Sequence, residues 1–306
     1  MLSIGFDTSN YTTSCAWSDG ETGENFSRLL DVRPGELGLR QSDALFAHIK
    51  RLPELSDRLF AHLNPGDIRA VGVSTRPRAV EGSYMPCFLA GECQARVLAD
   101  ALHIPLYTFS HQQGHIAAAL WSAGRLDLLE TPHLAWHLSG GTTELLLVTP
   151  EGKNVHAEKI GGTTDISAGQ LIDRTGQLLS MPFPSGKSID AAAKSTDSTD
   201  FFRVKVNGTS FSLSGVQNQI QNYYAQTQDA NATAAYCLRS VISAIRTATQ
   251  NALKDKKGYP VVFSGGVASN SLLRSSVSDL DAVFAAPEYS TDNAMGIAVL
   301  TALRET

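Results

Sequence analysis

Apolar residues recur along the chain in two alternating patterns, short runs of about five residues and longer stretches at helical spacing. The short runs are typical of buried strands, and the longer stretches are typical of amphipathic helices. The predicted strands are 2–7, 11–17, 70–74, 105–109, 133–138, 144–150 and 259–264. The predicted helices are 39–63, 84–102, one beginning at 111, 165–181, 214–227, 231–255, 267–277 and one beginning near 292. This alternation predicts an α/β protein.

The start and the middle of the chain share one pattern, which is a strand, a small polar turn and a second strand. It appears as "SIGFDTSNYTTSCAW" near the N-terminus and as "HLAWHLSGGTTELLLVTP" from His133. This weak internal repeat predicts that each half opens with the same hairpin. No low-complexity linker separates the halves, so we expect them to pack closely around a cleft.

The composition is that of an ordinary globular protein. The 306 residues are 42% hydrophobic and 18% charged, which is enough for two domains of about 150 residues. No run of about eighteen apolar residues is present, and the first residues lack the basic and apolar regions of a signal peptide. We therefore expect a cytoplasmic protein without a membrane span. The cysteines form no CxxC pair and are expected to be reduced: Cys15, Cys87, Cys93 and Cys237.

The net charge of −5 argues against a protein that binds nucleic acid without a partner. A partner or a local basic patch would have to attract the phosphates of RNA. Solvated surface charge is the more common explanation for short basic stretches. The two candidate stretches are "RAVGVSTRPR", with Arg69, Arg76 and Arg78, and "LKDKKG", with Lys254, Lys256 and Lys257.

Three turns of small residues follow predicted strands: "DTSNYTTS", "LSGGTTE" and "FSGGVASN". Backbone N–H groups in such turns can surround phosphate oxygens without obstruction by side chains. One such turn is weak support, because any tight turn needs glycine, but three in one chain favour a phosphate site. The chain has neither GxxxxGK[ST] nor a GxGxxG that follows a strand, which argues against a P-loop and a Rossmann site.

Two histidines four residues apart, His111 and His115, lie on one face of the predicted helix. The segment reads HQQGH rather than HExxH, so the general base of a zinc peptidase is missing. The pair could share a metal only with a third ligand, and otherwise it is an ordinary part of a helix. Asp292 is the candidate third ligand, and capping of the following helix is its alternative role. Three more carboxylates lie near turns, where ribose binding, helix capping and solvent exposure all remain open: Asp165, Asp173 and Asp190.

The motifs and their order resemble those of the TsaD/Gcp family, once named for O-sialoglycoprotein endopeptidase. Members of that family are the catalytic subunit in the synthesis of threonylcarbamoyladenosine in tRNA. The resemblance covers nearly the whole chain. The motifs that carry it are "SHQQGH", "LSGGTTELLLV", "TTDISAGQLIDRTGQLL", "PFPSG", "FSLSGVQN", "SGGVASNSLLR" and "STDNAMGIA".

The resemblance implies an actin-like ATPase (ASKHA) fold, with two RNase H-like domains around a nucleotide-binding cleft. The first domain is expected over 1–130, with the C-terminal helix 290–306 packing back on it. The second is expected over 131–289.

The family's site residues carry over to positions that match its motifs. His111, His115 and Asp292 match the metal ligands, with iron favoured and zinc compatible. An adenine nucleotide or carbamoyl-adenylate is the implied second ligand, and no catalytic residue beyond the metal site is implied. His137 stands where some relatives have a tyrosine near the metal, so a third histidine ligand and a side chain that merely points into the cleft are both open. The nucleotide-binding residues implied are His137, Leu138, Ser139, Gly140, Gly141, Asp173, Gly186, Asp190 and Asn270.

The implied reaction is metal-assisted transfer of a threonylcarbamoyl group from its adenylate to N6 of an anticodon-loop adenine of tRNA. Binding of tRNA is expected to need partner subunits, and a TsaB-like protein is one such partner. The sequence departs from the family's motifs at several places near the expected site, including Tyr11, Gln170 and Gln217. These departures leave two alternatives open: a paralogous carbamoyltransferase with a small-molecule or protein acceptor, and a non-catalytic nucleotide-binding scaffold.

Overall fold

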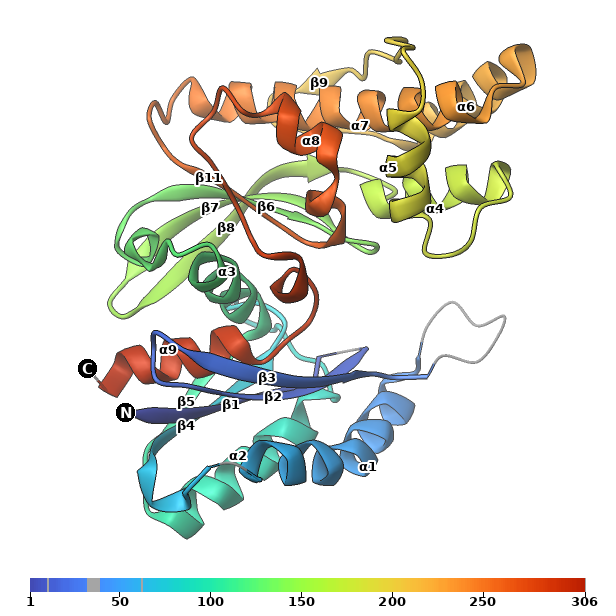
Figure 1. The fold of residues 1–306 in the computed structure, drawn as a ribbon. Helices are drawn as coiled ribbons and strands as arrows, with labels where there is room; N and C mark the ends of the chain where they lie inside the picture. The colour runs from blue at the N-terminus through green and yellow to red at the C-terminus, as the bar shows by residue number, and fades with distance from the viewer. Residues whose placement is uncertain (10, 32–38, 62, 306) are drawn as a thin grey trace. The chain divides into compact units, whose positions relative to one another are not determined.

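The computed structural model describes residues 1–9, 11–31, 39–61 and 63–305. The chain forms two compact units (Figure 1). Unit 1 consists of Met1–Thr131, Thr149–Ala157 and Glu288–Thr306, and unit 2 of Pro132–Val148 and Glu158–Pro287. Each unit is built on its own β-sheet, and each is described by itself below.

The sheet of unit 1 has five strands in the order β3-β2-β1-β4-β5. The strands are β1 (Leu2–Asp7), β2 (Thr12–Ser18), β3 (Gly23–Leu29), β4 (Ile68–Arg76) and β5 (Leu106–Ser110). β1, β2 and β3 form an antiparallel meander, while β4 and β5 run parallel to β1. The predicted strands of this half are confirmed, but β3 was not predicted. Its polar sequence, GENFSRL, buries only Phe26.

Helices cover both faces of this sheet. They are α1 (Gln41–Phe60), α2 (Phe88–Leu102), α3 (His111–Ser122) and α9 (Met295–Glu305), with short 3₁₀ turns η1 (Pro65–Asp67), η2 (Leu126–Glu130) and η4 (Pro287–Tyr289). Ile4 and Phe6 of β1 pack in one core with buried leucines of α1 and alanines of α2. The alternating residue Gly5 instead backs onto Ala298 of α9, because successive strand residues face opposite sides. The face toward α9 and α3 therefore carries the odd-numbered residues of β1.

Unit 2 repeats the same topology in a seven-stranded sheet, β12-β11-β6-β7-β8-β10-β9. Its strands are β6 (His133–Leu138), β7 (Thr143–Glu151), β8 (Asn154–Thr163), β9 (Val206–Asn207), β10 (Ser210–Phe211), β11 (Val261–Ser264) and β12 (Ala282–Phe284). The order β8-β7-β6-β11-β12 matches β3-β2-β1-β4-β5 strand for strand, with β6 antiparallel to β7 and parallel to β11. The weak repeat in the sequence thus corresponds to a duplicated sheet.

The helices of unit 2 bury their apolar faces in one core with the sheet. They are α4 (Ala168–Leu178), α5 (Gly186–Lys194), α6 (Ser214–Thr227), α7 (Ala230–Leu253) and α8 (Ser271–Ser276), with the 3₁₀ turn η3 (Gly266–Ser269). The indole Nε1–H of Trp136 in β6 donates to Oγ1 of Thr249 in α7, 2.9 Å away. α5 was not predicted, because it is short and directly follows a proline-rich segment.

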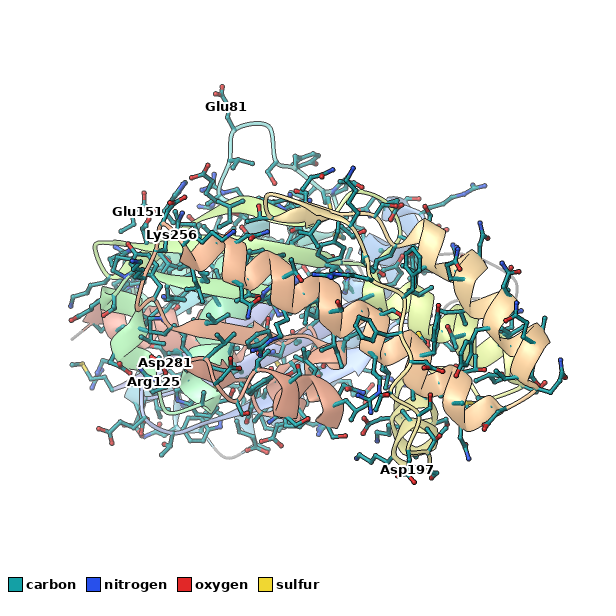
Figure 2. All side chains as sticks on the ribbon, turned by 90° about the horizontal axis from the view of Figure 1, so that it is seen from above. Glu81, Arg125, Glu151, Asp197, Lys256 and Asp281 are labelled. Carbon is teal, nitrogen blue, oxygen red and sulfur yellow. The ribbon has the colours of Figure 1, made fainter. Side chains whose placement is uncertain are left out.

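The arginines and lysines of the two candidate basic stretches are exposed or half-buried, as solvated surface charge is. Arg69 and Arg76 lie near opposite ends of β4, roughly 23 Å apart at the usual rise per residue. Lys254 donates to Oδ1 of Asn251. Exposed acidic side chains such as Glu81 and Asp197 also project from loops (Figure 2). Over the described ranges, no helix is both long and apolar enough to cross a bilayer, and none of the cysteines is in a disulfide.

Candidate metal centre and nucleotide-binding residues

The start of α3 presents two imidazoles on one face of the helix. Ser110 caps the helix through a capping box, in which its Oγ accepts from the N–H of Gln113 and the Gln113 side chain accepts from the N–H of Ser110. The predicted helix start is therefore confirmed. His111 becomes the first helical residue, His115 follows one turn later, and their ring centroids lie 4.3 Å apart in an edge-to-face arrangement.

A close crossing of α3 and α9 brings the segment before α9 to the histidines. A Cβ on Gly296 would collide with the carbonyl oxygen of Gly114, so the two helices can approach this closely only with glycine at that position. Figure 1 shows the two helices side by side. Asn293, not Asp292, accepts from the N–H of Met295 at the start of α9. The hydrogen bond at the start of α9 thus comes from Asn293, and the carboxylate of Asp292 has other partners.

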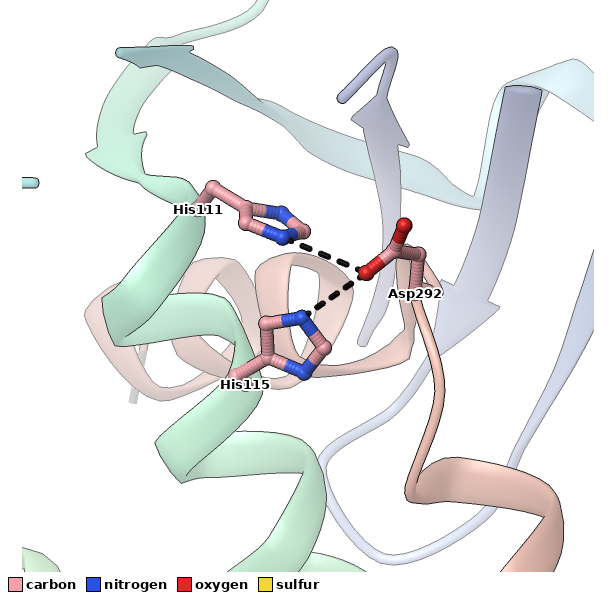
Figure 3. A group of neighbouring side chains, drawn as sticks. All are labelled: His111, His115 and Asp292. Atoms are coloured by element: carbon pink, nitrogen blue, oxygen red, sulfur yellow. Dashed lines mark hydrogen bonds and ion pairs between the residues drawn. The ribbon is translucent and has the colours of Figure 1, made fainter. Parts of the chain in front are cut away.

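Asp292 turns its carboxylate toward both imidazoles (Figure 3). Its Oδ1 lies 3.1 Å from Nε2 of His115 and 3.5 Å from Nε2 of His111. One donor atom from each residue lies within 4.8 Å of the others. In the described part of the chain, no other set of three such side chains brings its donor atoms as close.

These separations fit a shared metal ion. Donor atoms about 2.1 Å from a tetrahedral ion lie about 3.4 Å from one another, and those of an octahedral ion about 3.0 Å. The three donor atoms also have suitable chemistry, since two imidazole nitrogens and one carboxylate oxygen suit iron and zinc alike. Three protein ligands leave coordination positions for a substrate.

A second carboxylate, Asp7, lies behind His111. Its Oδ2 is 2.8 Å from Nδ1 of His111, and its side chain is 1% exposed. Burial opposes the charged form of His111, but Asp7 and Asp292 outweigh it and raise the pKa of that imidazole to about 10. Burial likewise would raise the pKa of both carboxyls, but the imidazoles hold each below its usual value. Without a metal, this cluster is therefore held together as an ion-paired network.

In unit 2, two glycine turns lie at the same edge of the sheet, because β6 and β11 are parallel neighbours. Ser139, Gly140 and Gly141 follow β6, where the Ser139 N–H donates to the Thr142 carbonyl. Around an added Cβ on Gly140 or Gly141 there is open space. Gly265, which follows β11 with φ at 91°, backs onto the carbonyl of Leu138. The two turns therefore form adjacent backbone surfaces.

His137 lies one residue before Leu138 at this edge, with its Nδ1 3.4 Å from Oγ of Ser264 in β11. It belongs to unit 2 and is not part of the three-residue cluster of unit 1. The role of His137 stays a prediction.

The remaining predicted nucleotide residues gather around α5. Oδ1 of Asp190 accepts from Nδ2 of Asn270 at 2.7 Å and from the hydroxyl of Ser271 at 2.9 Å, and its Oδ2 pairs with Lys194. The structure thus brings Asp190 and Asn270 together. Asp173 accepts from the N–H of Ser185, the residue before Gly186.

Asp165 has a structural role that the sequence left open. Its carboxylate accepts from the backbone N–H groups of Leu213 and Ser214 and from the hydroxyl of Ser212. These bonds hold the start of α6 against the loop before α4. Desolvation would raise the pKa of Asp165, but the hydrogen bonds outweigh it and lower that pKa. Asp7, by contrast, was missed altogether. The signal that could have found it is an acidic residue ending an otherwise apolar strand, LSIGFD.

Comparisons with known proteins agree with these features. Residues 38–299 match the family model for TsaD, described as tRNA N6-adenosine threonylcarbamoyltransferase. A protein of that name from Carboxydothermus hydrogenoformans is 30% identical over 262 residues, which cover 82% of this chain and 75% of the relative. Another, from Latilactobacillus sakei, is 35% identical over 217 residues, or 68% of this chain. That match covers 60% of the Latilactobacillus protein.

Among solved structures, the activator of the 2-hydroxyisocaproyl-CoA dehydratase from Clostridium difficile, with bound ADPNP, matches with a TM-score of 0.55. The match covers 100% of this chain and 96% of that one at 12% identity. At that identity the likeness concerns the fold alone. Together with the duplicated sheet, it establishes the predicted actin-like ATPase fold.

Proposed function

Since this chain belongs to the tRNA N6-adenosine threonylcarbamoyltransferase family, a family of transferases, we propose that it transfers a threonylcarbamoyl group to N6 of an adenine in the tRNA anticodon loop. The donor is the threonylcarbamoyl-adenylate, whose AMP is a good leaving group. The observation that carries the proposal is the convergence of His111, His115 and Asp292 on one point, in a chain that matches the family model over 38–299.

The three side chains of unit 1 are proposed to hold one divalent ion, with iron favoured and zinc compatible. When bound, such an ion supplies Lewis-acid polarisation of a carbonyl or phosphate oxygen. The chain itself contributes the orientation of the donors. The capping box of Ser110 fixes the first turn of α3, and the crossing at Gly114 fixes the position of Asp292.

Unit 2 is proposed to bind the adenosine and phosphate of the donor. The backbone N–H groups of Gly140 and Gly141 suit a phosphate, because neither residue has a side chain and the space where a Cβ would stand is open. Asp173 retains a second carboxylate oxygen for a hydroxyl, since only its Oδ1 accepts a hydrogen bond from the described residues. Asp190 is engaged with Asn270 and Lys194, so its proposed part is to position Asn270. Fixing the donor in this way orients its carbonyl for the incoming amine.

The adenine amine is most accessible in a single-stranded loop, where a base can be splayed out. With a net charge of −5 and its arginines spread along β4, this chain is proposed to bind tRNA together with partner subunits, a TsaB-like protein among them. The proposed setting is the cytoplasm, where tRNA is modified.

The proposal is tested by complementation. A strain depleted of its own synthase would express this chain, and threonylcarbamoyladenosine would be measured in its tRNA by mass spectrometry. We expect the modified nucleoside to return with the natural sequence and to be lost with Asp292→Ala. The exposed carboxylate of Asp281 provides the matched control, because Asp281→Ala removes an acidic side chain outside both sites. Absence of the nucleoside with folded, expressed protein would contradict the proposal.

A small-molecule acceptor is the second candidate, and the net charge of −5 favours it. The same expression strain distinguishes it. In that case the tRNA would stay unmodified, while the purified chain would still release AMP from a carbamoyl-adenylate.

A further inference from the structure

Asp7 ends β1 at the edge of the sheet nearest to the start of α3. Its backbone is fixed by β2, where it pairs with Ser14, and the hydroxyl of Ser14 donates to its carbonyl. Its side chain lies on the face of the sheet that packs against α9, the face toward which Gly5 also points. A buried carboxylate at this place is costly unless a partner offsets the loss of water.

The two oxygens of this carboxylate have different partners. Oδ1 accepts from the backbone N–H of Ser9 at 2.9 Å, which closes the turn after β1. Oδ2 lies 2.8 Å from Nδ1 of His111, at the opposite side of the ring from the nitrogen that faces Asp292. Holding the turn needs only the first oxygen, so the second contact calls for another explanation.

We propose that Asp7 is a positioning residue for the metal ligand His111. By accepting from Nδ1–H, it keeps the proton on that nitrogen and leaves the lone pair of Nε2 free to bind the ion. Its negative charge also makes the imidazole a stronger ligand. This inference rests on the metal centre proposed above and extends it with a residue that is not itself a ligand.

The substitution Asp7→Asn separates this role from that of a turn residue. The asparagine Oδ1 can still accept from the N–H of Ser9, so the turn keeps its hydrogen bond. Its Nδ2, however, can only donate to the ring of His111. That contact favours the tautomer with the proton on Nε2, which blocks the ligand atom.

Zinc affinity is the first measurement, made on the full chain at neutral pH by competition with a chromophoric chelator. We expect Asp7→Asn to weaken zinc binding roughly 10- to 100-fold, as removal of such a partner typically does. Asp19→Asn is the matched control. Asp19 also accepts from turn N–H groups, those of Glu21 and Thr22, but has no imidazole partner among the described residues. The Asp19→Asn protein should bind zinc with the affinity of the natural sequence.

The second measurement is the ¹⁵N spectrum of the imidazoles in the zinc-loaded protein, with His111 assigned by its loss in His111→Gln. We expect the natural sequence to show a protonated Nδ1 and a metal-bound Nε2. A purely structural role of Asp7 would not fix this tautomer. Because the spectrum is taken on the natural sequence, it remains decisive even if Asp7→Asn fails to fold.

The outcomes distinguish the inference from the proposal beneath it. If the natural sequence binds no zinc or iron, the metal centre itself is wrong and the inference falls with it. If it binds zinc and Asp7→Asn binds equally well, the role of Asp7 is refuted while the metal centre stands. A zinc-loaded His111 bound through Nδ1 would refute it as well.

Discussion

At the scale of single residues, the chain uses buried imidazoles in two opposite ways. His111 lies between Asp7 and Asp292, whose carboxylates favour its charged form. His48, in α1, is fully buried and hydrogen-bonds Oγ1 of Thr13 through its Nδ1, 2.8 Å away. Burial lowers the pKa of His48 from 6.5 to about 4, although Asp7 partly opposes this. His48 is therefore neutral in the folded protein at neutral pH.

This difference predicts a pH dependence of stability. Between pH 6.5 and 4 the unfolded chain binds a proton at His48 and the folded chain does not, so acidification favours unfolding. The free energy of unfolding should be unaffected by His48 above pH 6.5 and should fall by up to roughly 3 kcal/mol toward pH 4. Urea unfolding of the natural sequence and of His48→Gln at several pH values would measure it. If the unfolding free energy falls equally with decreasing pH in the two proteins, His48 does not titrate in this way.

The three residues of the candidate metal centre could be singled out from the sequence because their spacing and motifs are local. His111 and His115 lie one helical turn apart, and Asp292 was identified through its motif rather than by any contact with them. Asp7 could not be found in this way. Its contact with His111 spans 104 positions along the chain and depends on how β1 and α3 pack.

At the scale of elements, the geometry of the candidate metal centre depends on the crossing of α3 and α9. Gly296→Ala would place a methyl group against the carbonyl oxygen of Gly114. Because the atoms that this methyl group would meet are backbone atoms of a packed helix, we expect a loss of roughly 1–3 kcal/mol in unfolding free energy and weaker metal binding. Urea unfolding and zinc titration measure the two effects.

Gly215→Ala is the control for that substitution. Gly215 lies near the start of α6, and an added Cβ there meets no atom within 4 Å. Its stability should be unchanged or slightly higher, because alanine has the better helix propensity. If the Gly296→Ala protein has the same unfolding free energy and the same zinc affinity as the Gly215→Ala protein, the role of the crossing is contradicted.

The elements that the sequence did not predict lack a clear hydrophobic period. β3 and much of β8 (GENFSRL and NVHAEKIGGT) are exposed or half-buried and polar, so their hydrophobic pattern is weak. They form because each continues a meander whose inner strands are strongly apolar. α5 is nine residues long, too short for a clear period, and is stabilised mainly by packing on α7.

At the scale of the whole molecule, the duplicated order of strands is the feature that the sequence indicated only weakly. One turn of small residues after each first strand was visible in both halves, but the shared order of five strands was not. Pairing between β1 and β4, or between β6 and β11, joins segments more than 60 residues apart. Such long-range pairing leaves no local pattern, so the resemblance to a known family, rather than periodicity, predicted the fold.

We propose that His111, His115 and Asp292 hold one metal ion, and X-ray absorption spectroscopy of the iron- or zinc-loaded chain tests this claim. We expect one metal per chain, with scattering from two imidazoles in the natural sequence and from one in His115→Ala. The exposed His156 gives the control, because His156→Ala should retain both. A spectrum without imidazole ligands, or one that His115→Ala leaves unchanged, would contradict the claim.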